Sequence, residues 1–156
     1  MAGRAVFQIN NAVIKLAATQ AGLTAGIDYA CQISSAAVVT TANTNTVPMT
    51  GCAPASDVPA PSSYALVLTW VQDWQQAQSL SNYAYTNDTQ QVWWSITPNG
   101  LTAPVATGNS YVVSGDFGGD FGIPLTATAT WPCLAKPSIT AGAGTLEAPL
   151  QETAAA

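Results

Sequence analysis

A strict two-residue alternation runs through Leu125–Trp131 and constrains the fold more than any other feature of the chain. Its threonines fall on one side of an extended segment, and its apolar residues fall on the other side: Leu125, Ala127, Ala129 and Trp131. A helix would scatter these side chains around its axis, whereas a strand directs alternate residues to opposite faces. The segment therefore predicts a half-buried β-strand.

Three more segments predict strands. Tyr29–Val39 alternates, with Tyr29, Cys31 and Ile33 on one face, and Gln91–Thr97 is rich in aromatic and β-branched residues. Tyr64–Val71 is apolar on both faces, so we expect it to be covered on both sides. Weaker candidates are Val6–Ile9, Ala12–Leu16 and Asn109–Ser114. This series of short strands predicts a mainly β fold.

The remaining segments complete the expected architecture. Leu80, Tyr83 and Ala84 have helical spacing between Ser79, a suitable N-cap, and Asn87, a suitable terminator. The polar, proline-containing stretch 40–61 predicts a long loop, and the chain from Pro137 onward has no core pattern. We therefore expect one domain over 1–140, with an N-terminal arm and the first strands in 1–25, and a tail over 141–156.

Charge is scarce in this chain. Charged residues make up 7% of it, against 48% hydrophobic residues, and its net charge is −5. So neutral a surface gives copies of the protein little mutual repulsion, which favours self-assembly over a small monomeric sandwich domain. Three cations, Arg4, Lys15 and Lys136, cannot form the basic stripe that nucleic-acid or anionic-membrane binding requires. We also expect no membrane span and no signal peptide.

The residues for common catalytic chemistry are few. The chain has no histidine, which removes the usual general base and the commonest metal ligand. Three widely spaced cysteines, Cys31, Cys52 and Cys133, form neither a disulfide framework nor a zinc motif, so we expect buried free thiols in a protein made in a reducing cytoplasm. We predict a non-enzymatic protein without a cofactor.

Two features leave alternatives open. Asp116 and Asp120 lie in the glycine-rich stretch 114–122, where they could solvate a turn, hold calcium or act as a carboxylate pair in glycoside hydrolysis. We favour the turn. The five tryptophans could form a sugar-binding platform, but packing within and between subunits is favoured. Trp93 and Trp94 are adjacent on a predicted strand and so face opposite sides.

Several of these segments together resemble the tail tube proteins of actinobacterial long-tailed phages. The resemblance covers about 26–140 and depends on the order of its pieces. These pieces are 26–35, 47–58 around Gly51-Cys52-Ala53-Pro54, 64–74 ending in Thr69-Trp70-Val71-Gln72-Asp73-Trp74, Leu80-Ser81-Asn82-Tyr83, Asn87-Asp88-Thr89, 113–119, 127–133 and Lys136-Pro137.

The resemblance implies a β-sandwich or barrel with one short flanking helix. Six copies would form a ring whose inner strands join into one continuous barrel, and rings would stack into a tube with a loop and the termini bridging them. It implies a virion protein made in the host bacterial cytoplasm, with the tape measure, tail terminator and distal tail proteins as partners. DNA would pass through without specific binding during ejection.

Two sets of residues carry this hypothesis. We expect packing between subunits at Trp93 or Trp94 and along the stretch that contains Thr41, Asn43, Thr44, Asn45 and Thr46. Six copies at −5 each carry roughly −30 of formal charge, enough for a negative channel. Some of the aspartates would line it: Asp28, Asp57, Asp73, Asp88, Asp116 and Asp120. The alternatives are a capsid decoration protein and a carbohydrate-binding sandwich module.

Overall fold

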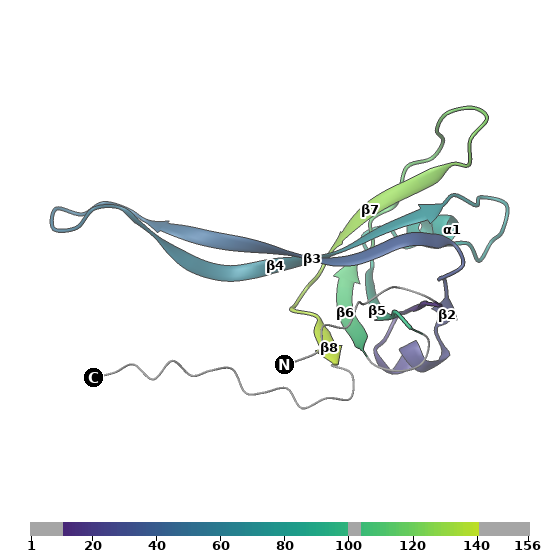
Figure 1. The fold of residues 1–156 in the computed structure, drawn as a ribbon, viewed down its shortest axis with the longest axis horizontal. Helices are drawn as coiled ribbons and strands as arrows, with labels where there is room; N and C mark the ends of the chain where they lie inside the picture. The colour runs from purple at the N-terminus through teal and green to yellow at the C-terminus, as the bar shows by residue number, and fades with distance from the viewer. Residues whose placement is uncertain (1–10, 100–103, 141–156) are drawn as a thin grey trace, which may run out of the picture.

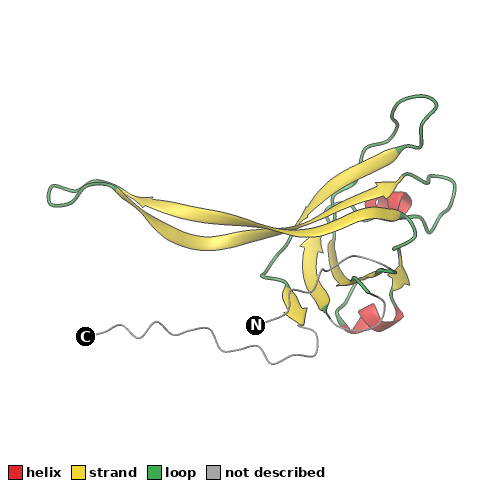
Figure 2. Cartoon of the chain, in the orientation of Figure 1, coloured by secondary structure: helices red, strands yellow, loops and turns green. Residues whose placement is uncertain are grey.

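The computed structural model describes residues 11–99 and 104–140, which form two antiparallel sheets (Figures 1 and 2). Sheet A has the order β2-β1-β5-β6-β8, with bounds Ile27–Asp28, Val13–Ala17, Gln91–Thr97, Val105–Tyr111 and Ser138–Thr140. Sheet B has the order β3-β4-β7, with bounds Ile33–Val47, Ser56–Val71 and Thr126–Pro132. One α-helix, α1 (Leu80–Thr86), and a 3-10 turn, η1 (Ala21–Ala25), accompany them.

The two sheets pack face to face around one apolar core. Sheet A contributes Leu16, Val92 and Trp94, and sheet B contributes Leu68 and Trp131, all of them buried. Along β7 the burial alternates strictly, with the threonines exposed and Ala127, Ala129 and Trp131 buried. The alternation read from the sequence is therefore confirmed, and the fold is the expected mainly β sandwich with a single α-helix.

Each of the three fully buried tryptophans has a hydrogen-bond partner for its indole N–H. Trp70 donates to Ser81 Oγ at 3.0 Å, Trp94 donates to Ser110 Oγ at 2.8 Å, and Trp131 donates to the Val113 carbonyl at 2.8 Å. A buried N–H without a partner would cost about 1–3 kcal/mol. These bonds let the core bury large aromatic side chains, and they tie sheet B to α1 and to the chain after β6.

The helix forms where its caps predicted. Ser79 Oγ accepts from the Asn82 backbone N–H at 3.3 Å, and the backbone N–H of Asn87 bonds to the Tyr83 carbonyl at the other end. Gln32 Oε1 accepts from the Leu80 N–H at 2.7 Å, which satisfies another N–H of the first turn. The prediction from Ser79 and Asn87 is confirmed.

Two predictions for the first half of the chain were wrong. The stretch 40–61 is not a loop: it continues β3 and begins β4, and only 48–55 connects them. Its many Thr, Ser and Asn residues suggested a loop, but its Val and Thr content suits a ribbon that is exposed on both faces. The strand expected over Tyr29–Val39 begins at Ile33 instead, because Tyr29–Gln32 forms a turn in which Gln32 N donates to the Tyr29 carbonyl at 2.9 Å.

Other expectations need smaller corrections. Within one chain the segment Tyr64–Val71 is covered on one face only: Leu66 and Leu68 are buried, while Val71 is exposed on the other face. The chain after Pro137 first forms β8, which pairs with β6. The candidate strand Val6–Ile9 lies outside the described residues. Within the described ranges, no helix is long and apolar enough to cross a membrane.

Candidate assembly surfaces

The far halves of β3 and β4 form an arm that extends beyond the sandwich (Figure 1). β7 pairs with β4 only from Ala65 to Val71, so the two-stranded ribbon 40–64 has no third strand within the part of the chain that the structure describes. At its tip, Thr50 and Ala53 exchange two backbone hydrogen bonds of 3.0 and 3.3 Å. No residue from Val39 to Pro59 is buried or even half-buried. A two-stranded ribbon alone is marginally stable in water, so we expect the arm to be stabilised by contact with another surface.

Backbone hydrogen bonds show which way the peptide groups of β4 point. Val71 N donates to the Gln32 carbonyl on the β3 side, and Gln72 N donates to the Leu125 carbonyl on the β7 side. The Tyr64 carbonyl accepts from Cys133 N, again on the β7 side. Because peptide groups alternate along a strand, odd-numbered residues from Ser63 to Val71 bond to β3. Their partners on β3 are the odd-numbered residues, so its even-numbered residues point outward.

The outer edge of β3 is therefore open along its whole length. Among the described residues β3 pairs with β4 alone, and its sequence, ISSAAVVTTANTNTV, contains no proline and no charge. The outward peptide groups belong to Ala36, Val38, Thr40, Ala42, Thr44 and Thr46. Proteins usually protect such an edge with charge, proline or a cover, because an open edge is a template for another strand.

The matching edge of β4 on the arm is blocked. Between the pairs that Thr41 and Asn43 form with β4, two residues of β4 face one residue of β3, and Asn43 Nδ2 donates to the Pro61 carbonyl at 2.8 Å across this bulge. Beyond the bulge the inward residues of β4 are Ala60, Val58 and Ser56, which leaves Pro59 directed outward. Proline has no N–H to offer there. The arm thus has one receptive edge and one blunted edge.

The outer face of sheet B carries no charge on any of its strands. Residues that pair directly share a face, so the register places these residues together: Ser35, Ala37, Val39, Ala65, Val67, Thr69, Val71, Thr126, Thr128 and Thr130. Thr69 Oγ1 and Thr128 Oγ1 lie 2.9 Å apart in a hydrogen bond. This surface of hydroxyls and small aliphatic groups would offer phosphate groups neither attraction nor a cation to hold them.

Aromatic side chains gather at the end of the molecule opposite the arm. The Trp74 ring centroid lies 5.1 Å from that of Phe117 and 6.1 Å from that of Tyr85, both in edge-to-face arrangement. Phe121 and Ile123 follow in the loop 112–125 between β6 and β7 and are exposed. We call these five residues the aromatic end. Exposed apolar side chains in such number mark an interaction site.

The six candidate aspartates lie outside the sheet B face. Asp28 Oδ1 accepts from Ile14 N and Ala30 N, Asp73 Oδ1 accepts from Gln75 N and Gln76 N, and Asp88 Oδ1 accepts from Ser114 N. Asp57 is on the arm, where Thr46 Oγ1 donates to its Oδ1 at 2.6 Å. Asp116 and Asp120 are exposed in the loop 112–125. Three of the six thus anchor turns by accepting backbone N–H groups.

The loop with Asp116 and Asp120 is built as a turn. Gly118, Gly119 and Gly122 all have positive φ angles, which suits glycine. No group of three or more potential metal ligands occurs among the described residues. A hollow of about 520 Å³ at the base of the arm is lined by residues 61–64 and 133–136, which include Lys136 but no carboxylate. This hollow therefore contains no pair of an acidic and a basic side chain.

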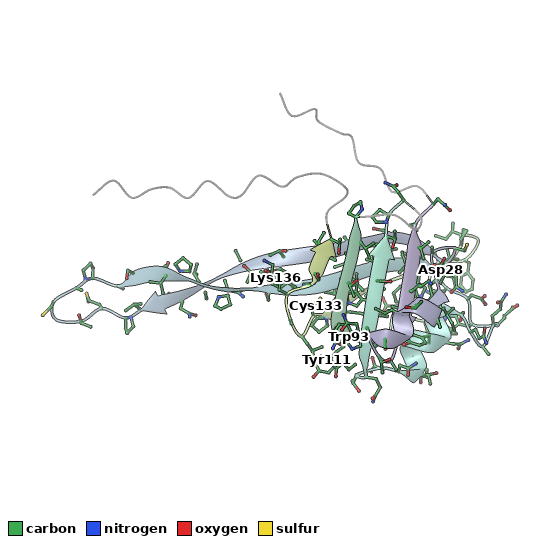
Figure 3. The ribbon with its side chains drawn as sticks, turned by 90° about the horizontal axis from the view of Figure 1, so that it is seen from below. Asp28, Trp93, Tyr111, Cys133 and Lys136 are labelled. Atoms are coloured by element: carbon green, nitrogen blue, oxygen red, sulfur yellow. The ribbon has the colours of Figure 1, made fainter. Side chains whose placement is uncertain are left out.

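The candidate packing residues separate into two locations. Trp93 and Trp94 face opposite sides of sheet A, as predicted. Trp94 is fully buried within the chain. Trp93 is half-buried on the outer face of sheet A, on the same side as Tyr111 (Figure 3). The other five all lie on the arm: Thr41, Asn43, Thr44, Asn45 and Thr46. Arg4 lies outside the described residues. Lys15 Nζ donates to the Thr24 carbonyl at 3.0 Å, and Lys136 is exposed.

The three cysteines are free in the structure, but the expectation that they are buried was wrong: Cys31 and Cys52 are exposed, and Cys133 is half-buried. Cys52 lies at the tip of the arm, and Cys133 Sγ accepts from Ser110 Oγ at 3.3 Å. The sequence did not lead us to predict the aromatic end, although Asp116-Phe117 and Asp120-Phe121 lie in the glycine-rich stretch that we considered. Two phenylalanines in such a loop could have indicated an exposed apolar surface, because a glycine-rich loop offers few side chains against which they could be buried.

The known proteins that resemble this chain do so in structure. No family model matches it, and no curated protein matches it in sequence. A chain of the virion of a native gene transfer agent particle is 12% identical, with a TM-score of 0.52, and the match covers 84% of this chain and 96% of that one. A chain from the tail of an empty particle of that kind, which has C6 symmetry, is 14% identical with a TM-score of 0.53, and the coverage is 83% and 95%. The fold is therefore shared with components of a virion-like particle and its tail.

Proposed function

We propose that this chain is a structural protein of a phage-like tail, and more specifically that six copies form a ring and rings stack into the tail tube. The observation that carries the proposal is sheet B: three strands with an open edge on β3 and a face without charge. The likeness to a tail chain with C6 symmetry supports the same assembly. DNA would pass through the tube into the host.

In this proposal sheet B faces the channel. The open edge of β3 in one copy would meet the β7 edge of the next, so that six sheets close into a barrel without free edges. A rotation about the tube axis preserves strand direction, and β3 and β7 run the same way because each is antiparallel to β4. The β3 strand of one copy and the β7 strand of the next copy would therefore pair in parallel.

The channel wall would then be neutral rather than acidic along the strands. The six candidate aspartates lie in turns, loops and the arm, so we propose that those near the ring boundaries supply the negative potential. Salt limits the range of such charges to about 8–10 Å. Lys15 and Lys136 are not on the sheet B face, so phosphates would meet no cation on these strands.

Electron microscopy of the purified full chain tests the proposal. We expect six-fold rings and stacked tubes, with hexamers and longer species in light scattering. A protein that stays monomeric at high concentration and forms no ring would overturn it. Binding to preformed capsids without tubes would instead support the decoration protein, and, likewise without tubes, specific binding on a glycan array would support the carbohydrate-binding module. The partners proposed from the resemblance, the tape measure, terminator and distal tail proteins, would be tested by co-purification with the tube.

A further inference from the structure

The outer face of sheet A, which points away from the core, carries a hollow of about 350 Å³. Strands β1, β5 and β6 form its floor, and the segment that contains η1 forms one side. Six of the residues that line it carry polar side chains: Lys15, Gln20, Thr24, Ser95, Thr97 and Thr107. None of the described residues that line it is a carboxylate. Hydroxyl and amide groups in a hollow of this size suit a small polar ligand.

Strands β5 and β6 continue this surface beyond the hollow. Ser95 pairs with Thr107, and Trp93 pairs with Asn109 in the next row on the same face. Residues two positions apart on a strand are separated by about 7 Å, which is close to the length of one sugar unit. The Trp93 side chain is half-buried, so part of its ring is open to a ligand (Figure 3). A ligand with one unit in the hollow would therefore bring a second unit to the indole ring.

Asn109 adds a polar group whose hydrogen bonding is incomplete. Its Oδ1 is buried, and no donor among the described residues bonds to it. Native proteins usually supply a partner to a buried acceptor. The side chain as a whole is only half-buried and lies beside Trp93 on the outer face. A ligand hydroxyl that reached this position would supply the missing donor once the amide turns about its Cβ–Cγ bond.

We propose that this face binds a neutral saccharide, with one sugar in the hollow against Ser95 and Thr107 and the next sugar stacked on Trp93. A sugar ring carries C–H groups on its faces and hydroxyls around its rim. The C–H groups pack against the electron-rich face of an indole ring. The hydroxyls both donate to and accept from the serine and threonine hydroxyls and the amide of Asn109.

The charges of this face favour a neutral ligand over a charged one. Lys15 is the one cation among the residues that line the hollow, and its Nζ already donates to the Thr24 carbonyl at 3.0 Å. Asp28 pairs with Lys15 across β1 and β2, so the two opposite charges share the outer face. The chain as a whole carries −5 and would repel an anionic polymer. The charges therefore balance locally and leave hydroxyl, amide and indole groups to select the ligand.

The proposed tube would repeat this site many times on one surface. With sheet B toward the channel, the outer face of sheet A lies on the outer wall, and each ring presents six sites. A single shallow site binds weakly, but sites repeated along a tube bind a long polysaccharide with much higher avidity. The inference goes beyond the tube function, since one chain carries the whole site and does not need a ring to bind.

Titration of the unassembled full chain with three neutral hexasaccharides tests the site: maltohexaose, cellohexaose and mannohexaose. Calorimetry measures the affinity, and tryptophan fluorescence reports on Trp93. At least one sugar should bind, and Trp93→Ala should weaken its binding about tenfold, the value of one stacked ring. Thr107→Val keeps the shape of the side chain, and it should also weaken binding because a hydroxyl is lost. Phe117→Ala at the aromatic end and Thr130→Val on the sheet B face are the matched controls and should bind normally.

The outcomes separate this inference from the proposed function. No binding of any of the three sugars, or equal affinity in the Trp93→Ala and Thr107→Val variants and the unaltered chain, would overturn it. Tighter binding of hexagalacturonate, a carboxylated counterpart, would overturn the choice of a neutral ligand. Binding by the monomer that disappears in tubes would show that neighbouring copies cover the face, and would overturn its role on the tube wall. Protein that binds a sugar at this site yet forms no rings would contradict the tube function and support the saccharide site.

Discussion

The sandwich and the arm are built from the same two strands, yet they are stabilised in different ways. In the sandwich half of β4, Leu66, Leu68 and Trp70 are buried against sheet A. In the arm half, the same strand is exposed from Ser56 to Pro59, and no third strand from 11–99 or 104–140 lies beside it. One half of the hairpin thus completes a core, and the other half presents its edge and its faces to the surroundings.

Stability and assembly therefore depend on different parts of the chain, stability on the sandwich and assembly on the arm. The sandwich provides hydrogen-bond acceptors for its buried indole N–H groups, those of Trp70, Trp94 and Trp131. The arm leaves β3 peptide groups without partners among the described residues of one copy, and it exposes Val47 and Val58. We therefore expect changes in the sandwich to act on folding and changes in the arm to act on assembly.

The largest expected effect is in the sandwich. Trp94→Ala should lower the free energy of unfolding of the monomer by about 3–5 kcal/mol, because it leaves a cavity and removes the indole N–H that donates to Ser110 Oγ. Chemical denaturation of unassembled protein measures it. Trp93→Ala is the matched control on the other face of β5 and should cost much less. A Trp94 variant of normal monomer stability that fails only in assembly would return Trp94 to the interface between subunits.

The next effect is on assembly alone. Shortening both strands of the arm together, by removing 42–47 and 56–61, should change the free energy of unfolding of the monomer by no more than about 0.5 kcal/mol, because no buried side chain is lost. It should abolish stacking in electron micrographs. Deleting residues from one strand only would shift the register and exchange the two faces. Normal tubes from the doubly shortened arm would show that the arm has no part in assembly.

The fold could be predicted from the sequence where burial imposes a period, and it could not where burial is absent. Leu125–Trp131 and Gln91–Thr97 alternate because one face of each meets the core, so their strands were predicted almost to the residue. The arm has no buried face, and its Thr, Asn and Ser content is as typical of a loop as of an exposed ribbon. The aromatic end was missed because its residues come from α1 and two loops that only the fold brings together.

A smaller effect concerns the blunted edge of the arm. Pro59→Thr should restore an outward N–H on β4 without changing the stability of the sandwich, since Pro59 is exposed and distant from the core. With both edges open, arms should pair side by side and form irregular aggregates alongside tubes. Thioflavin T fluorescence and turbidity measure the change. Ala60→Thr, an inward-bonding position, is the control, and equal aggregation of the two variants would contradict the role of Pro59 in protecting the edge.

The smallest effect is a pH dependence that belongs to the sandwich alone. Burial raises the pKa of Tyr29 above its ordinary 10.0, and the nearby Tyr83, with its ring centroid 5.7 Å away, raises it further. Burial also raises the pKa of Tyr83. Both phenols are thus held neutral in the folded state, while in the unfolded chain they ionise near pH 10. Their contribution to stability is fully present below pH 10 and is lost as the pH rises above it toward the folded pKa values.

Replacing both tyrosines by phenylalanine should therefore make the sandwich less sensitive to alkali. The free energy of unfolding of Tyr29→Phe, Tyr83→Phe protein should fall less between about pH 8 and about pH 11 than that of the unaltered chain, because phenylalanine has no proton to lose. Tyr111→Phe, at an exposed position, is the control and should keep the original dependence. The doubly shortened arm should keep it too, since neither ring lies on the arm. An equal alkaline loss in the Tyr29→Phe, Tyr83→Phe variant would place the titrating groups elsewhere and remove this distinction between sandwich and arm.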